Sequence, residues 1–362
     1  MFDLSWLQAS TAEVLAAAPP GWKRSRLPRR DLVAIGASLA AIVVASIAGA
    51  VVGGIDEWVG FAVLGAFALI AYSLFAYVYA AVRRRREPDE LRFAWTAGAN
   101  GLRYLRGALP SGGTMIMRIG HSLTGDRHFG SAGRGEFGVL QYSTGYGRGE
   151  ERHTWHYIAA RLPAPLPHLV LDAAANNRPV FGSSDLPRVF DKRQRVSLEG
   201  GFDRRFQLYA PAEYAQDALY VFTPDVMAAF IDNAAAYDVE IVDDTVMFFS
   251  EGGVDYRRAE PWTDAERILT AVVPVLAERA RRYRDERVAG QPPRAIDQDA
   301  AARETAGAAA GRAGDADALT GASAAAPTIA AAGRRLASHR AFGWAGAAVV
   351  FVLAMALLLR GL

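Results

Sequence analysis

Three stretches of the chain contain no charged side chain, namely residues 32–52, 58–82 and 341–359. At a rise of about 1.5 Å per residue, the first would form a helix of roughly 30 Å, which matches the hydrocarbon thickness of a bilayer. The second begins after a break that is too short for anything but a tight turn. The pattern predicts a transmembrane helical hairpin at residues 31–82 and a third transmembrane helix at residues 341–359. For the third run, the alternative is a helix that packs on the soluble part of the chain.

A signal peptide is the alternative interpretation of the first run, because Ala48, Gly49 and Ala50 resemble a cleavage site of small residues. The charged leader before the run is, however, about twice the usual length of such a region. A second hydrophobic run also follows at once, which favours the hairpin.

Basic residues set the expected orientation, since Lys and Arg gather on the cytoplasmic side of a membrane. Basic side chains precede the hairpin between residues 23 and 30, whereas its turn contains the acidic pair Asp56 and Glu57. Four arginines follow the hairpin: Arg83, Arg84, Arg85 and Arg86. Both ends of the hairpin should thus be inside, so that the main domain faces the cytoplasm from the plasma membrane. Basic residues before the third run, against Arg360 after it, would place the last residues outside.

Residues 1–30 form a basic leader whose first part carries apolar side chains, among them Phe2, Leu4, Trp6 and Leu7. Such a pattern is typical of a short amphipathic helix in the membrane interface. A frayed segment with a few apolar side chains is the alternative.

The patterns after the hairpin predict an α+β domain with a mainly antiparallel sheet at residues 137–288, preceded by a helix and a glycine-rich connector at residues 83–136. Residues 110–138 are expected to be mostly loop, because glycine is frequent and periodicity is weak there. Proline residues at 163, 165 and 167 are expected to separate two strands, and Asp243-Asp244 to form a turn between two others. The expected strands are residues 137–142, 153–162, 168–172, 195–198, 206–209, 239–242 and 246–249.

Two helix starts can be placed from capping signals. Thr223 and Pro224 fit the cap and first position of one helix. Thr263 and Glu266 fit a capping box for a longer helix, which is expected to reach Arg287 with a kink at Pro274. After it, residues 289–340 are rich in Ala and Gly, which predicts a disordered linker.

One segment resembles a known family. Phe202 and Phe206 lead into a strand, Tyr214 and Asp217 follow, and an Ala-Leu-Tyr run at residues 218–220 precedes Thr223-Pro224. This order resembles an uncharacterised family of bacterial membrane-anchored proteins that carries only a domain-of-unknown-function label. The resemblance covers about residues 137–250 and implies paired N-terminal spanning helices. It implies no activity, and the alanine-rich tail and last hydrophobic run depart from the family's common form.

Candidate chemistry is sparse. The chain has no cysteine, which excludes disulfides, a thiol nucleophile and cysteine-type zinc sites, and its net charge of +2 is too small to indicate nucleic acid as a partner. His153 and His156 would face opposite sides of a strand and cannot easily share a metal, while His121 and His128 are expected in a loop. The glycine-rich residues 130–138 precede a strand, whereas a phosphate-binding loop follows one. The sequence therefore predicts no catalytic, metal-binding or cofactor-binding residue.

The basic residues at the end of the long helix have two interpretations. Arg279, Arg281 and Arg282 are expected either to interact favourably with the helix dipole or, together with Arg83–Arg86, to contact anionic lipid headgroups. The resulting hypothesis is a membrane-tethered cytoplasmic domain that binds a protein or lipid partner without catalysis. The alternative is a membrane-associated hydrolase that uses carboxylates of the central domain between Glu199 and Asp217. Neither the partner nor the oligomeric state can be predicted.

Overall fold

The computed structural model describes residues 1–19, 72, 88–131, 133, 135–177, 184–289, 291 and 329–340. They fall into two compact units, of which one is residues 3–100 and the other comprises residues 1–2 and 101–362. The predicted membrane spans at 32–52, 58–82 and 341–359 lie outside the described residues, Tyr72 excepted. None of the helices formed by the described residues has the length and apolar character needed to cross a membrane.

The smaller unit contains a folded leader. Helix α1 (Ser5–Gln8) and helix α2 (Thr11–Ala16) pack on a helical segment at residues 88–99. Ser10 and Glu13 form a complete capping box at the start of α2. Trp6 packs against Trp95 with ring centroids 5.9 Å apart, and the guanidinium of Arg92 donates to the carbonyl of Ala9. Residues 1–19 of the leader are therefore folded rather than frayed, and the location of the leader in a membrane interface stays a prediction.

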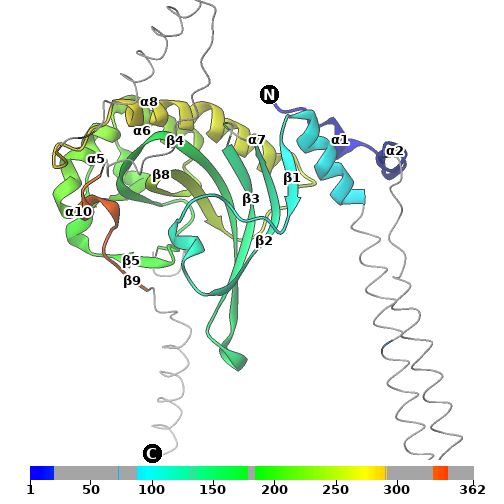
Figure 1. Ribbon diagram of the computed structural model, residues 1–362, viewed down its shortest axis with the longest axis horizontal. Coiled ribbons are helices and arrows are strands. Elements are labelled where there is room, and N and C mark those ends of the chain that lie inside the picture. Colours follow the sequence, from blue (N-terminus) through cyan, green and yellow to red (C-terminus); the bar gives the residue numbers. More distant parts are fainter. Residues whose placement is uncertain are drawn as a thin grey trace, which may run out of the picture. The chain divides into compact units, whose positions relative to one another are not determined.

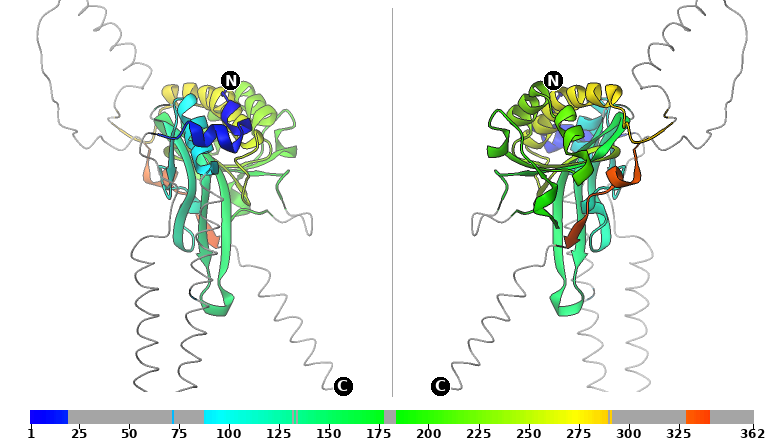
Figure 2. Two further views of the ribbon diagram at one scale, coloured as in Figure 1. Left: turned by 90° about the vertical axis from the view of Figure 1, so that its right-hand side faces the viewer. Right: turned by 90° about the vertical axis from the view of Figure 1, so that its left-hand side faces the viewer.

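The larger unit is built on a seven-stranded, antiparallel sheet, which confirms the expected α+β class (Figure 1). The strand order is β1-β2-β3-β4-β7-β6, and β8 also pairs with β4. The hairpin between β3 and β4 extends past the other strands (Figure 2). The strands are β1 (Arg103–Arg106), β2 (His121–Ser131), β3 (Gly135–Thr144), β4 (Glu151–Ala173), β6 (Arg195–Val196), β7 (Phe206–Tyr209) and β8 (Asp238–Glu251).

Strand β2 corrects the expectation of a loop between residues 110 and 138. This eleven-residue strand contains two glycines and pairs with β3 across two shifts of register. Pairing within the sheet outweighs the low strand propensity of glycine. His121 and His128 therefore lie on a strand.

Strands β4 and β8 are each continuous where the sequence predicted two. The three prolines of β4 lie within a stretch where its pairing with β8 shifts register, between Arg161 and Leu169. Proline has no N–H to donate, so it is tolerated where the ladder is interrupted. In β8, Asp243 has a positive φ of 54°, which bends the strand without ending it. The expected turn at Asp243-Asp244 was thus wrong.

Helices cover one face of the sheet, among them α6 (Pro224–Asn233), α7 (Glu260–Arg267) and α8 (Val273–Arg282) (Figure 1). A π-helical turn at Ile268–Val272 joins α7 to α8. The predicted start of α6 is confirmed, with Thr223 at the N-cap and Pro224 in the first turn. The predicted capping box at Thr263 was wrong. The helix begins at Glu260, and the Thr263 hydroxyl donates to the Glu260 carbonyl from inside it. The π-helical turn ends two residues before Pro274, and regular helix ends at Arg282, short of the expected Arg287.

The other face carries a second hydrophobic core. Buried side chains of β3, β4 and β8, including Tyr142, Trp155 and Phe249, pack with Met115 and Ile116 of the turn η1 (Met115–Met117). Leu186, Phe190 and Leu336 complete the same cluster. Phe190 ends strand β5 (Arg188–Phe190), which pairs with β9 (Ser338–Arg340) in a separate two-stranded sheet. Residues 329–340, which the sequence placed in the linker, thus return to the domain as helix α10 (Ala331–Arg334) and β9.

Candidate functional site

Ionisable side chains gather on the face of the sheet that the helices leave uncovered. His168 and Asp172 lie on β4 and alternate with Val170 of the second core, so all three point to that face. On β8, Glu240 lies opposite Val170, and Asp238 is two residues away on the same face. With Asp185, which precedes β5, these residues form what we call the polar band: His168, Asp172, Asp185, Asp238 and Glu240. Each is buried.

His168 and Glu240 form a buried pair in the polar band. Nε2 of His168 lies 2.8 Å from Oε1 of Glu240. The second carboxylate oxygen of Glu240 accepts the backbone N–H of Met115. On the other side of the ring, Nδ1 of His168 lies 2.8 Å from the backbone nitrogen of Leu336. Because a backbone N–H can only donate, Nδ1 is the acceptor, which places the imidazole proton on Nε2, facing Glu240.

The remaining members of the band are three carboxyl groups. Oxygens of Asp172, Asp185 and Asp238 lie within 4.8 Å of one another, and Asp238 also accepts the N–H of Ala173 at 2.8 Å. Burial raises the pKa of Asp172 to about 6, and burial followed by the charge of Asp185 raises the pKa of Asp238 well above its usual value. These are the changes expected when like charges are held together away from water. An all-oxygen set suits a hard divalent cation, but proton sharing satisfies the same geometry.

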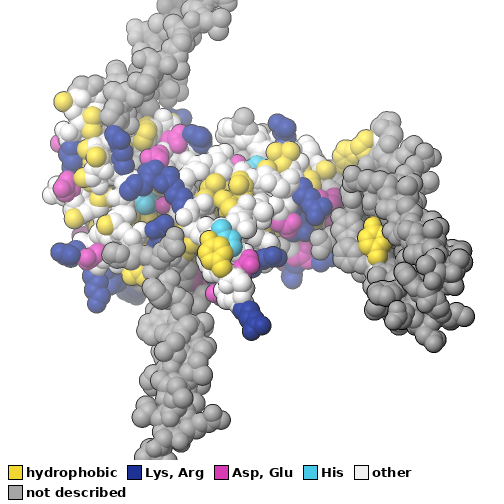
Figure 3. Space-filling view, turned by 60° about the horizontal axis from the view of Figure 1, so that its bottom comes forward, with side chains coloured by type: hydrophobic (Ala, Val, Ile, Leu, Met, Phe, Trp, Pro, Cys, Tyr) yellow, Lys and Arg dark blue, Asp and Glu magenta, His cyan; other side chains and the backbone are white. Residues whose placement is uncertain are grey.

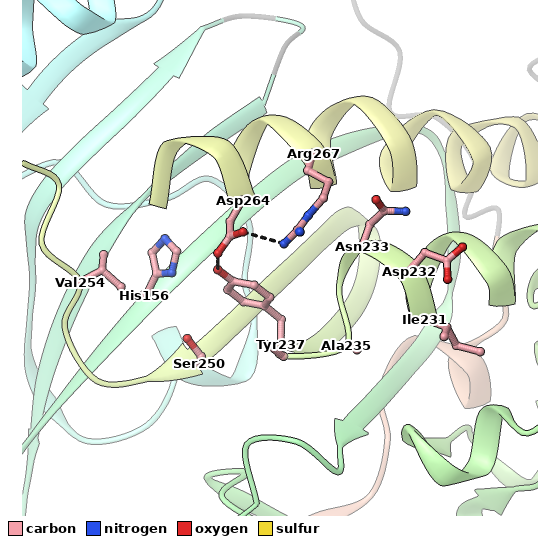
Figure 4. A pocket seen from close by; sticks show the side chains of 11 residues that line it. His156, Ile231, Asp232, Asn233, Ala235, Tyr237, Ser250, Val254, Asp264 and Arg267 are labelled. Atoms are coloured by element: carbon pink, nitrogen blue, oxygen red, sulfur yellow. Dashed lines mark hydrogen bonds and ion pairs between the residues drawn. The ribbon is translucent and has the colours of Figure 1, made fainter. Parts of the chain in front are cut away.

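A surface hollow of about 290 Å³ lies where the end of α6, the start of β8 and α7 meet (Figure 4). Asp264 lines it from α7, accepting a hydrogen bond from the Tyr237 hydroxyl at 3.2 Å and pairing with Arg267 at 2.6 Å. His156 lines the hollow but is itself buried, with its ring against Tyr237, and burial lowers the pKa of this histidine to about 4. The hollow is therefore lined by the ion pair of Asp264 and Arg267, by the carboxylate of Asp232 and by a histidine that is neutral.

The arginines predicted to contact lipid lie in the last turn of α8, where the positive charge complements the helix dipole. Arg279 makes two contacts with the carboxylate of Asp225, at 2.9 and 3.0 Å, and so joins α8 to the first turn of α6. Arg282 and Arg281 approach Glu278 at 2.6 and 3.6 Å. Arg83–Arg86 lie outside the described residues. Lipid contact by either group stays a prediction.

Two of the carboxylates proposed for a hydrolase, Asp203 and Asp217, have structural partners. Asp203 accepts hydrogen bonds from the Ser197 hydroxyl and the Leu198 N–H. Asp217 accepts the Tyr283 hydroxyl at 2.6 Å and pairs with Arg287 at 2.9 Å. Within the described ranges, neither belongs to a group of three acidic or histidine side chains close enough to share an ion.

The histidines behave partly as predicted. His153 and His156 do lie on opposite faces of β4, with His153 bonded to the Thr144 hydroxyl at 2.8 Å and His156 buried near Tyr237. His128 lies 2.8 Å from the hydroxyl of Tyr157 and 3.6 Å from Glu136, so it has an acidic neighbour that the sequence did not indicate.

The face drawn in Figure 3 carries both signs of charge, because basic and acidic side chains are interspersed with hydrophobic ones.

The sequence did not indicate the polar band, because its members come together through the pairing of β4 with β8, which joins positions far apart in the chain.

Comparison with protein-family models, with curated proteins and with solved structures found no match to this chain.

Proposed function

We propose that this chain is a multi-pass protein of the plasma membrane whose α+β domain faces the cytoplasm and binds a protein or lipid partner without catalysing a reaction. The membrane assignment rests on the three uncharged runs and on the arginines that flank them. The resemblance to a bacterial membrane-anchored family is consistent with it.

The observation that carries the proposal is the docked position of residues 329–340. Strand β9 ends at Arg340, and the third apolar run begins at the next residue. A spanning helix at residues 341–359 would therefore hold the α+β domain against the membrane surface, without the long spacer that the sequence suggested. Such placement favours a domain that acts on partners at the membrane.

The burial and the existing partners of the acidic side chains favour a binding role over hydrolysis. A hydrolase of the expected kind needs a carboxylate pair that reaches substrate and water. The clustered carboxyl groups of the polar band are less than one-tenth exposed, and Asp238 is fully buried. In the surface hollow, Asp264 is already engaged by Tyr237 and Arg267.

Fractionation and topology reporters test the membrane part of the proposal. The full-length protein should sediment with membranes and be released by detergent. Reporters fused after Arg86 and after Leu362 should report the cytoplasm and the exterior, respectively. Uncleaved protein in the supernatant without detergent would contradict the proposal, and a cytoplasmic report at Leu362 would remove the third span.

Crosslinking in intact membranes tests the binding part. Affinity purification after crosslinking should recover a defined partner or lipid whose yield falls when the exposed surface of the α+β domain is altered. Turnover of phosphate or glycosyl esters by the purified full-length protein, lost on Asp203→Asn or Asp217→Asn, would instead support the hydrolase.

A further inference from the structure

Residues 329–340, which we call the strap, cross the face of the sheet opposite α6, α7 and α8 and are held at several separate points. At the first, the backbone N–H of Ala330 donates to the carboxylate of Asp285 at 2.9 Å, and the Tyr214 hydroxyl donates to the same group at 2.6 Å. Gly333 then lies against the Tyr214 ring so closely that an added Cβ would be 2.3 Å from Cζ. The strap thus fits this surface closely at its helical end.

The other contacts lie nearer the end of the strap. Arg335 forms a two-pronged ion pair with Asp243, at 2.9 and 2.8 Å, at the bend in β8. Leu336 is 6% exposed and belongs to the second core. Ser338–Arg340 pair with β5. Loss of the strap would therefore expose apolar side chains around Leu336 together with His168 of the polar band.

One contact depends on a protonation state. Between the Ala330 and β9 contacts, the N–H of Leu336 donates to Nδ1 of His168, whose Nε2–H faces Glu240. A proton on Nδ1 would remove the acceptor and set two N–H groups against each other. Glu240 would remain paired with the resulting imidazolium, so that protonation would weaken the strap contact while the buried ion pair persists.

We propose that the strap is a pH-sensitive latch, docked while His168 is neutral and released when His168 is protonated, so that the His168–Glu240 pair and the apolar surface around Leu336 become accessible. Because docking of the strap requires a neutral His168 ring, protonation of His168 and release of the strap are linked equilibria. The proposal holds whether or not residues 341–359 span a membrane.

The other charged groups around His168 define what else could respond to pH. Glu240 faces it from β8, Asp243 lies at the bend of the same strand, and Arg335 belongs to the strap. Arg118, which follows η1, contributes positive charge near Asp243. The hydrogen bond from Arg335 lowers the pKa of Asp243, so this group stays ionised in the range where histidine titrates. His339 lies within β9 and needs its own control.

The absence of cysteine allows selective spin labelling of the full-length protein in lipid nanodiscs. Spin labels would be attached to Ala337→Cys in the strap and to Arg193→Cys beside β5. The distance between the two labels would be measured by double electron–electron resonance at pH 7.5 and 5.5. Both positions are exposed. We expect a narrow distance distribution at pH 7.5 and at least a threefold larger fraction of long, broadly distributed distances at pH 5.5.

Four variants make the outcome decisive. His168→Gln should abolish the pH response, whereas His339→Gln should keep it. Gly333→Ala should release the strap at both pH values and shows that the labels detect release. Arg335→Ala leaves His168 in place and should move the midpoint of release to higher pH by about half a unit or more, because a weaker strap needs less protonation. This variant serves if His168→Gln fails to fold.

The proposal is overturned if the wild-type distances do not change with pH while Gly333→Ala shows release. It is also overturned if His168→Gln retains the full response, if His339→Gln abolishes it, or if Arg335→Ala leaves the midpoint unmoved.

Discussion

The carbonyl oxygen of Arg127 lies 2.0 Å from the position that a Cβ atom on Gly138 would occupy. The two residues belong to β2 and β3, which pair with Gly138 directly opposite His128. The hydroxyl of Tyr157 lies 2.8 Å from the same position. A glycine is thus required there by the approach of a neighbouring strand.

We therefore expect Gly138→Ala to lower the free energy of unfolding by about 2–3 kcal/mol, because relief of the overlap must shift a paired backbone. Urea denaturation of the detergent-solubilised full chain, followed by tryptophan fluorescence, would measure the loss. Gly253→Ala is the matched control, since its Cβ would make an ordinary 3.6 Å contact with Thr154, and it should change stability by less than about 0.5 kcal/mol. Equal losses in the two variants would refute the explanation.

Asp172 should make stability depend on pH. Its pKa rises from 3.8 in the unfolded chain to about 6 in the fold, mainly because of burial. The folded state thus binds the proton more tightly, and this group's contribution to stability is fully present below pH 3.8 and is lost as pH rises through about 6.

Asp172→Asn, which cannot ionise, is expected to raise the free energy of unfolding at pH 8 by about 3 kcal/mol, an order of magnitude that follows from a pKa shift of about two units. At pH 4.5 the gain should be about a third as large, because only the unfolded chain is largely ionised there. Thermal melts at both pH values would measure this difference, with the exposed Asp255→Asn as a control for surface charge. A gain of the same size at both pH values would show that ionisation is not the cause.

Arg279 and Arg281 provide a comparison between structural and lipid roles. Arg279→Gln should lower the free energy of unfolding by about 0.5–1 kcal/mol, because its paired contacts with Asp225 join α6 and α8. Arg281→Gln, whose guanidinium lies 3.6 Å from Glu278 in the same helix, should cost less.

Melts in nanodiscs of zwitterionic and of anionic lipid would separate the two roles. A structural pair predicts the same difference between the variants in both lipids. Contact with headgroups predicts a further loss in both variants that occurs only with anionic lipid and weakens with added salt.

Local signals in the sequence predicted those elements whose ends are set by nearby residues. Strand β7 was predicted with its observed bounds, Phe206–Tyr209, and the start of α6 at Pro224 followed from its proline and the preceding threonine. The α+β class followed from such segments together.

Signals that depend on distant partners were misread. The prolines of β4 indicated a break, but β8 pairs on both sides of them and keeps the strand continuous. Asp243 indicated a turn, whereas its positive φ is accommodated within β8, where Arg335 pairs with it from nearly a hundred positions away. The return of residues 329–340 could not be predicted, because its contacts with Asp285, Asp243 and His168 are all long-range. The polar band escaped detection for the same reason.

The return of residues 329–340 also means that noncovalent contacts alone should be sufficient to hold this segment on the domain. The segment is held on the domain by an ion pair, by strand pairing and by the buried side chain of Leu336. The chain between the domain and the segment mainly lowers the entropic cost of bringing the two together. A single protease cut between residues 292 and 328 should therefore yield two fragments that copurify, and separately expressed halves divided there should reassemble by complementation.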